Sequence, residues 1–256
     1  YLKKVNSGVL DIHVEKLKNS LAKRIKDSEK LTEEQKSIFT DDRLVHLLKD
    51  EPMPLYDLHL EIMKELIPGY DDNEFENLKM ANHKKEDNRT DAENQLVEKY
   101  SLLNTLFAVF DYRNALSQNK SRSYWLTKMK DQDVCTYCNR QYTFTVIKET
   151  EDGKRENDDS RIARPALDHW FPESLYPIMS LSFYNLIPSC TICNSSAKGD
   201  ALFKFETHIH PYLNDKPNPT FKFGYLPNGK RWTVDFIDVT DVKEKQMLDD
   251  FYLREL

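Results

Sequence analysis

Two short motifs, Cys135-Thr136-Tyr137-Cys138 and Cys190-Thr191-Ile192-Cys193, decide the fold of the region in which they lie. Two residues between paired cysteines allow one tight turn to present both sulfurs to one metal ion, and two such turns complete a tetrahedral site of four thiolates. The pairs are farther apart than in a simple zinc ribbon, so an insertion is carried between them. All four cysteines of the chain belong to these pairs. The motifs therefore predict a structural zinc ion, which stabilises a region that lacks a large hydrophobic core of its own.

Two other uses of paired cysteines compete with zinc. A pair of disulfides requires an oxidising compartment, and the chain does not open with the pattern of a secretory leader. A redox dithiol needs one reactive pair and leaves the second pair unexplained. The residues favour zinc, and we expect a cytoplasmic location.

The insertion and its flanks carry residues suited to metal-assisted hydrolysis. Asp168 and the amide oxygen of Asn194 are the kind of ligand that a hard cation such as Mg²⁺ prefers. His169 has the side chain whose ordinary pKa lies near neutrality, which suits a general base. Asn185 is suited to holding the loop by hydrogen bonds. Each residue taken alone is more often structural, as a core histidine, a cap or a turn residue. The hypothesis depends on their occurring together beside a cysteine pair.

The ordered string of a Cys pair, DH-x-x-P, and N-L-x-P-x-C-x-x-C-N-x-x-x-K-G resembles the HNH endonucleases over about residues 128–212. The resemblance implies a ββα-metal fold around one divalent ion, Mg²⁺ or Mn²⁺. It also implies that His169 is the general base, Asn185 the central Asn, and Asp168 and Asn194 the metal ligands. The last position of the motif, often His in the family, is here Asn194, which leaves the choice of metal open.

Longer phrases, among them DHWFPES at 168–174 and CNSSAKGD at 193–200, resemble a narrower group. This group is the PtuB nucleases of the Septu and retron-linked anti-phage systems. The resemblance implies an ATPase of the PtuA type as partner. The substrate class implied is nucleic acid, with DNA favoured and tRNA as the other candidate. The alternatives are a non-catalytic zinc-stabilised module that binds nucleic acid or a protein, and a redox or metal sensor, which leaves the DH and N motifs unexplained.

Three further side chains are weaker candidates. His208 and His210 alternate, so on a strand they would share one face and could add a metal position or contact the scissile phosphate. The competing interpretation is an ordinary half-buried edge strand. Lys198 is suited to meeting a phosphate, although a solvated lysine beside Gly199 is at least as consistent with the sequence.

Charge is distributed unevenly along the chain. The 256 residues have a formal net charge of −6, and residues 41–98 hold 16 acidic and 7 basic residues, a net charge of −9. Like charge repels a polyanion, so we expect this stretch to bind a protein, the ATPase, or to pack as a scaffold on its own chain. No apolar run approaches the ~20 residues of a membrane helix, so no membrane partner is expected.

Periodicity predicts an α+β chain in three parts. Residues 1–118 are expected to be a helical partner-binding or scaffold region, with apolar residues at helical spacing and a long helix over 91–116. Residues 81–93 are expected to be an exposed loop or a fraying helix end. Residues 119–215 are the expected nuclease zone, with strands over 141–149 and 163–168 and a turn or mobile loop over 151–160. Residues 216–256 are expected to form a hairpin, 221–226 with 231–237, and a last helix over 241–256.

Overall fold

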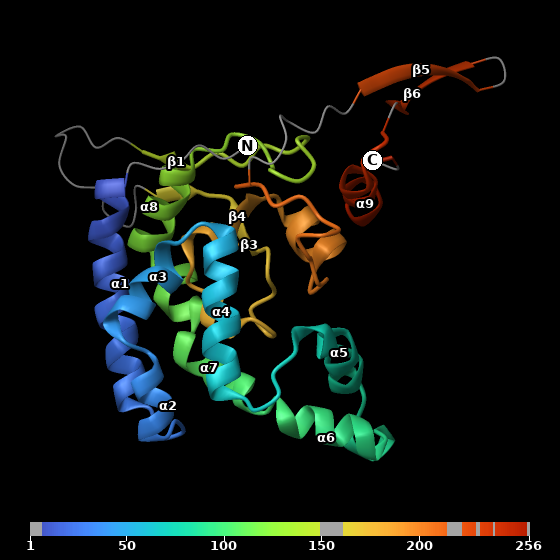
Figure 1. Ribbon diagram of the computed structural model, residues 1–256. Coiled ribbons are helices and arrows are strands. Elements are labelled where there is room, and N and C mark those ends of the chain that lie inside the picture. The colour runs from blue at the N-terminus through green and yellow to red at the C-terminus, as the bar shows by residue number, and fades with distance from the viewer. Residues whose placement is uncertain (1–6, 149–160, 214–221, 229–230, 238, 255–256) are drawn as a thin grey trace. The chain divides into compact units, whose positions relative to one another are not determined.

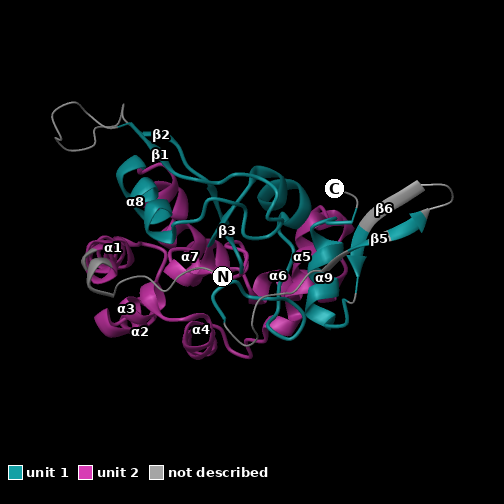
Figure 2. Cartoon of the chain, turned by 90° about the horizontal axis from the view of Figure 1, so that it is seen from above, with its two compact units in different colours: residues 1–4, 120–170, 187–256 teal, residues 5–119, 171–186 magenta. Residues whose placement is uncertain are grey.

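The computed structural model describes residues 7–148, 161–213, 222–228, 231–237 and 239–254. Figure 2 shows that the chain divides into two compact units. Unit 1 contains the described residues of 120–170 and 187–254, and unit 2 contains those of 7–119 and 171–186. Helices and strands are both present, which confirms the mixed class expected from the sequence. The three-part division at residues 118 and 215 stays a prediction.

Unit 2 is built mainly from helices (Figure 1), and their buried apolar side chains form its core. Helix α1 packs against α3 and α7, and α3 packs against α4. Threonines cap three of the helices, and at Thr32 and Thr90 a full capping box forms. Side chains of α1, α3 and α4 that are at most 1% exposed form the centre of the packing: Leu21, Leu44, Leu47, Leu55, His59, Ile62 and Met63. The elements are α1 (Ser7–Asp27), α2 (Glu33–Ile38), α3 (Asp41–Lys49), α4 (Pro52–Leu66), η1 (Asp72–Glu74), α5 (Phe75–His83), η2 (Glu86–Asn88), α6 (Asp91–Lys99), α7 (Leu102–Phe110), η3 (Arg113–Ser117), η5 (Pro177–Met179) and η6 (Phe183–Asn185).

Residues 171–186 fold with these helices although they lie far along the chain. The ring of Phe171 stacks on Tyr56 at 5.3 Å between centroids. Tyr176 donates its hydroxyl to Asp72 at 3.2 Å, and Ser182 donates to the carbonyl of Leu47. Residues 171–186 are therefore part of the core of unit 2.

The helical half differs from the sequence expectation in two places. The helix expected over 91–116 ends at Tyr100, because this buried tyrosine caps α6 and donates its hydroxyl to the carbonyl of Asp71 at 2.8 Å. After α7, Asp111 adopts a positive φ of 29° and a π-helix follows. The segment 81–93, expected to be an exposed loop or a fraying helix end, begins with the last turn of α5. It is then interrupted by η2 and by the capping box of α6, so only short connections remain.

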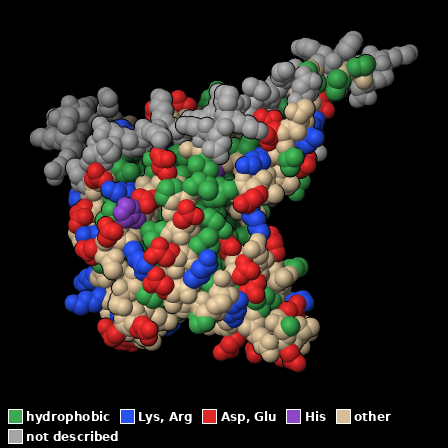
Figure 3. Space-filling view, viewed as in Figure 1, with side chains coloured by type: hydrophobic (Ala, Val, Ile, Leu, Met, Phe, Trp, Pro, Cys, Tyr) green, Lys and Arg blue, Asp and Glu red, His purple; other side chains and the backbone are tan. Residues whose placement is uncertain are grey.

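Acidic side chains of unit 2 are partly paired with basic ones. On the face drawn in Figure 3, Lys and Arg side chains are interspersed with Asp and Glu side chains over α1 to α4. Arg43 contacts Glu61 at 2.5 Å and Glu65 at 2.6 Å, and Lys18 contacts Asp41 at 3.0 Å. Within the described part of the chain, no helix is both long enough and apolar enough to cross a membrane.

Unit 1 combines short strands with short helices. Its strands pair two by two, β1 with β2, β3 with β4 and β5 with β6. The antiparallel pair β5–β6 confirms the predicted hairpin, and residues 229–230 lie outside the described residues. Helix α9 confirms the last helix but ends at Asp250, earlier than predicted. The elements are α8 (Lys120–Lys130), β1 (Val146–Ile147), β2 (Arg161–Ala163), β3 (Ala166–His169), β4 (Leu186–Ser189), η7 (Ile192–Lys198), β5 (Lys222–Asn228), β6 (Arg231–Ile237) and α9 (Val242–Asp250).

The strand expected over 141–149 is mostly absent. Only Val146 and Ile147 form β1, because the backbone just before it closes on the first cysteine pair instead. Cys135 donates its N–H to the carbonyl of Gln141 at 2.8 Å, and Thr143 donates to the carbonyl of Asp133 at 2.9 Å. Residue 149 and the turn expected over 151–160 lie outside the described residues. The segment expected over 163–168 divides into β2 and β3 at Arg164-Pro165, because proline has no N–H to donate to a ladder.

Candidate metal centre and adjoining polar cluster

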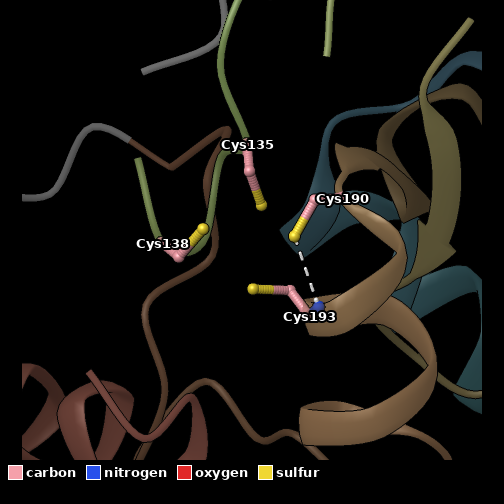
Figure 4. Close-up of side chains that lie close together, drawn as sticks. All are labelled: Cys135, Cys138, Cys190 and Cys193. Carbon is pink, nitrogen blue, oxygen red and sulfur yellow. Dashed lines mark hydrogen bonds between the residues drawn. The ribbon is translucent and has the colours of Figure 1, made fainter. Parts of the chain in front are cut away.

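The four cysteines converge on one point (Figure 4). Their sulfurs all lie within 4.8 Å of one another. Cys135 and Cys138 belong to the loop after α8, Cys190 directly follows β4, and Cys193 lies at the start of η7. Four ligands at the zinc–sulfur bond length of about 2.3 Å place tetrahedral sulfurs about 3.8 Å apart, so a small contraction accommodates the ion. The four cysteines are free of disulfides, and the donor set fits zinc.

The backbone around the cysteines fixes both turns. Cys193 donates its N–H to the Cys190 sulfur at 3.4 Å, the contact drawn as a dashed line in Figure 4. Asn139, at φ 51°, donates to the carbonyl of Cys135 at 2.8 Å and closes the first turn. Thr136 donates to the carbonyl of Pro188 in β4 at 3.3 Å. The first cysteine pair is thereby attached to the strand that leads into the second.

The thiols perturb one another's pKa values. A hydrogen bond from Cys193 lowers the pKa of Cys135 to about 5, and the same bond raises the pKa of Cys193. Burial raises the pKa of Cys190. The cluster therefore favours a thiolate at Cys135 and protons on Cys190 and Cys193, and zinc binding would release those protons.

Asp168 lies in β3, is 3% exposed, and already has two partners. Its Oδ2 accepts a hydrogen bond of 2.6 Å from the hydroxyl of Tyr137. Its Oδ1 and Oδ2 each lie 3.4 Å from the Nζ of Lys198. Burial raises the pKa of Asp168 to about 6, and the Lys198 ammonium and the Tyr137 hydrogen bond act against that rise.

Lys198 is the last residue of η7 and is 4% exposed, so it is not a solvated lysine. Besides Asp168, its ammonium donates to the backbone carbonyl of His169 at 2.7 Å. It also lies over the ring of Phe203, 5.0 Å from the centroid. The expected contact with a phosphate would require this ammonium to leave three partners.

His169 and Asn194 are the half-buried members of the predicted set. His169 ends β3, and Asn194 lies in η7, which contacts β3. The backbone of Asn194 is fixed by a bond from its N–H to the carbonyl of Cys190 at 3.0 Å and by one from Gly199 to its own carbonyl at 3.1 Å. This last bond spans five residues and belongs to a π-helix, a form that is frequent at functional sites.

Asn185 belongs to unit 2 and is fully buried. Its side-chain oxygen accepts from the N–H of Phe171 at 2.7 Å, and its Nδ2 donates to the carbonyls of Phe171 and Met179, both at 3.1 Å. Phe171 follows His169 by two residues in the sequence. The expectation that Asn185 fixes a loop by hydrogen bonds agrees with these three contacts.

His208 and His210 do not lie on a strand, and the expectation of a shared strand face is wrong. Residues 204–212 form turns, because the N–H of His208 bonds back to the carbonyl of Lys204 at 2.8 Å. His208 pairs with Asp250 at 3.0 Å. His210 is 3% exposed and packs on Trp170 at 4.6 Å, and burial lowers its pKa to about 3.

The donor set around Asp168 does not present an open site for Mg²⁺ or Mn²⁺. Among the described residues, the four cysteines are the one group of three or more His, Cys, Asp or Glu side chains gathered closely enough to hold a metal ion. The carboxylate of Asp168 is buried and its charge is compensated by Lys198. A divalent ion would have to displace that ammonium and take its other ligands from His169, Asn194, water and substrate.

Tyr137 is not among the residues predicted from the sequence, and Lys198 was predicted to contact a phosphate rather than Asp168. Tyr137 lies between the cysteines of the first pair, a position that reads as a spacer in the motif. The sequence offers one signal for this contact. A tyrosine inside a tight turn places its hydroxyl near the residues that the turn packs against, and a buried hydroxyl usually finds a hydrogen-bond partner.

Parts of the chain are similar to two known proteins. Septu protein PtuB of Bacillus thuringiensis is 31% identical over 90 residues, which cover 35% of this chain and 31% of PtuB. Protein ea31 of Escherichia phage lambda is 42% identical over 50 residues, which cover 19% of this chain and 17% of ea31. Each match thus spans less than a third of the relative's length. No family model and no solved structure matches the chain.

Proposed function

We propose that this chain is an endonuclease of the HNH type that acts as the effector of a Septu-like anti-phage system. The observation that carries the proposal is the attachment of the Asp168–His169 strand end to the four-cysteine cluster through Tyr137 and Lys198. The partial similarity to PtuB supports the same assignment. The pairing of β3 with β4, followed by η7, is compatible with the ββα-metal fold implied by the resemblance.

In the proposed reaction His169 acts as general base. Its imidazole takes a proton from water, the water oxygen attacks phosphorus, and the bond from phosphorus to the leaving sugar oxygen breaks. The leaving oxygen then takes a proton from solvent water, and the imidazolium of His169 returns its proton to solvent. Lys198 holds the main chain of His169, and Asn185 holds the main chain at Phe171. Mg²⁺ or Mn²⁺, when bound, would stabilise charge on the phosphoryl oxygens. Asn194 would be its oxygen donor from the protein, and Asp168 could join it only by giving up its contact with Lys198.

A cleavage assay over several substrates tests this proposal. Supercoiled plasmid, single-stranded DNA and tRNA are each incubated with the full chain and Mg²⁺, Mn²⁺ or EDTA. We expect plasmid to be nicked and linearised in the presence of metal and to stay supercoiled with EDTA. Specific cleavage of tRNA would support the nuclease activity and identify RNA, rather than DNA, as the substrate. Binding of nucleic acid without cleavage under all conditions would favour the alternative, a non-catalytic zinc-stabilised binding module.

We further propose that unit 2 binds an ATPase of the PtuA type. Its acidic stretch, residues 41–98 with a net charge of −9, repels nucleic acid, which favours a protein partner. Deleting the helices would remove the elements against which residues 171–186 pack. Reversing the charge of exposed acidic residues in unit 2 is therefore the cleaner test. Changing the exposed residues Asp57, Glu76 and Asp87 to Lys should weaken co-purification with the ATPase. The same change at Asp131, Asp133 and Asp249 in unit 1 is the control.

A further inference from the structure

We infer that Tyr137 and Lys198 are positioning residues through which the two cysteine turns hold the Asp168–His169 pair. The inference rests on the proposed function, since it assigns His169 the role of base. Each turn, or the helix that continues it, contributes one polar side chain to β3, and both side chains end on adjacent residues of that strand.

The first turn fixes the hydroxyl of Tyr137. This residue lies between Cys135 and Cys138 and is 4% exposed. Its ring stacks on Phe251 at 4.4 Å between centroids with an interplanar angle of 16°. Because the ring is held on one side by the turn and on the other by this aromatic contact, the hydroxyl has one place to point, the Oδ2 of Asp168 at 2.6 Å.

The second turn fixes the ammonium of Lys198. Helix η7 contains Cys193 near its start and Lys198 at its end, so the metal cluster sets the position of the whole helix. The ammonium bridges the two residues of the pair, with the carbonyl of His169 at 2.7 Å and the carboxylate of Asp168 at 3.4 Å. Burying a charged lysine is unfavourable without such partners. Both partners belong to β3, the strand that carries the proposed base.

The two contacts act on different parts of the strand. Tyr137 restrains a side chain, and Lys198 restrains that side chain together with the main chain of the next residue. Removing either contact should leave the cysteines and their zinc in place but let the end of β3 move. A base displaced by about 1 Å loses roughly a hundredfold in rate, so activity should respond more strongly than zinc content does.

The test uses the full zinc-loaded chain. Tyr137→Phe removes the hydroxyl and keeps the ring, and Tyr142→Phe, at an exposed tyrosine, is its matched control. Lys198→Gln removes the ammonium, and Lys245→Gln on the exposed side of α9 is its control. Lys198→Arg retains the charge and tests rescue. Measured are zinc per chain, hydrogen–deuterium exchange of peptides covering 166–169, and kcat and KM for plasmid cleavage.

We expect Tyr137→Phe to retain full zinc, to exchange faster over 166–169 and to lose about tenfold or more in kcat with KM nearly unchanged. Lys198→Gln should show larger changes of the same kind, partly rescued in Lys198→Arg. Unchanged exchange over 166–169 in Tyr137→Phe would overturn the inference, as would a loss of activity that follows loss of zinc. If the unaltered chain cleaves nothing, the proposed function fails, while the exchange measurement still decides whether the two residues hold the strand.

Discussion

Replacing Lys198 by Met removes the cation of a buried ion pair. The Lys198 side chain is 1% exposed and that of Asp168 is 3% exposed. Removing one partner of such a pair leaves an uncompensated charge and typically costs about 3–5 kcal/mol of unfolding free energy. We expect a loss of this size near pH 8, from unit 1, to which both residues belong.

The loss of unfolding free energy caused by Lys198→Met should become smaller as the pH falls. The pKa of Asp168 is raised by burial to about 6 even with Lys198 beside it, against an ordinary value of 3.8. Without the ammonium that pKa rises further, so the folded variant takes up a proton at a higher pH than the unfolded chain does. A carboxyl with a raised pKa destabilises the folded state above that pKa, and protonation relieves the penalty below it. At pH 5 the loss should be about 1–2 kcal/mol.

Urea denaturation followed by tryptophan fluorescence measures these values, since Trp125, Trp170 and Trp232 all belong to unit 1. Zinc is kept saturating throughout. The double variant Asp168→Asn/Lys198→Met has no buried charge and should recover at least about 2 kcal/mol relative to Lys198→Met. A loss below about 1 kcal/mol at pH 8, or a double variant no more stable than Lys198→Met, would refute the buried ion pair.

Other predictions concern zinc, acid stability and Asn185. Cys135→Ser should lower zinc below one ion per chain by elemental analysis and abolish the unfolding transition of unit 1, because structural zinc supplies folding free energy; a variant with full zinc and an unchanged transition contradicts this. Unfolded histidine binds a proton below pH 6.5, whereas buried His210 does so only near pH 3, so stability falls as the pH drops. Between pH 7 and pH 5 the buried His210 should lower the free energy of unfolding by about 2 kcal/mol. His210→Phe should lack this loss in urea titrations, and an equal pH dependence of stability in both proteins would contradict the prediction. Asn185→Ala should cost about 3 kcal/mol in thermal unfolding followed by circular dichroism, because backbone groups lose buried partners; the exposed Asn104→Ala should cost little, and equal effects would remove the special role of Asn185.

Much of the architecture is readable from the sequence because it depends on local signals. Apolar spacing marks the helices of unit 2, and the spacing of the cysteines predicts one four-sulfur cluster. The β5–β6 hairpin follows from two aromatic and β-branched runs that are close together in the sequence, and its first strand continues through Pro227 and Asn228. Helix ends were harder, since the break at Tyr100 depends on a tertiary hydrogen bond to Asp71.

The candidate site was less readable because burial decides what each polar residue does. Lys198 beside Gly199 reads as a solvated or phosphate-binding residue, yet the fold buries it against Asp168. The alternation of His208 and His210 indicates a strand only if the backbone is extended, and a turn at Lys204 prevents that. Tyr137 carries no motif of its own, and its contact with Asp168 joins residues 31 positions apart.

Plasmid cleavage by the full chain and by its His169→Ala variant tests the central claim most directly. Both proteins should contain one zinc ion per chain and give the same circular dichroism spectrum. The unaltered chain and the exposed control His83→Ala should both nick supercoiled plasmid in Mn²⁺. His169→Ala should be slower by about a hundredfold or more, the usual contribution of a general base. Cleavage by His169→Ala at the rate of the unaltered chain would contradict the assignment of His169 as the base.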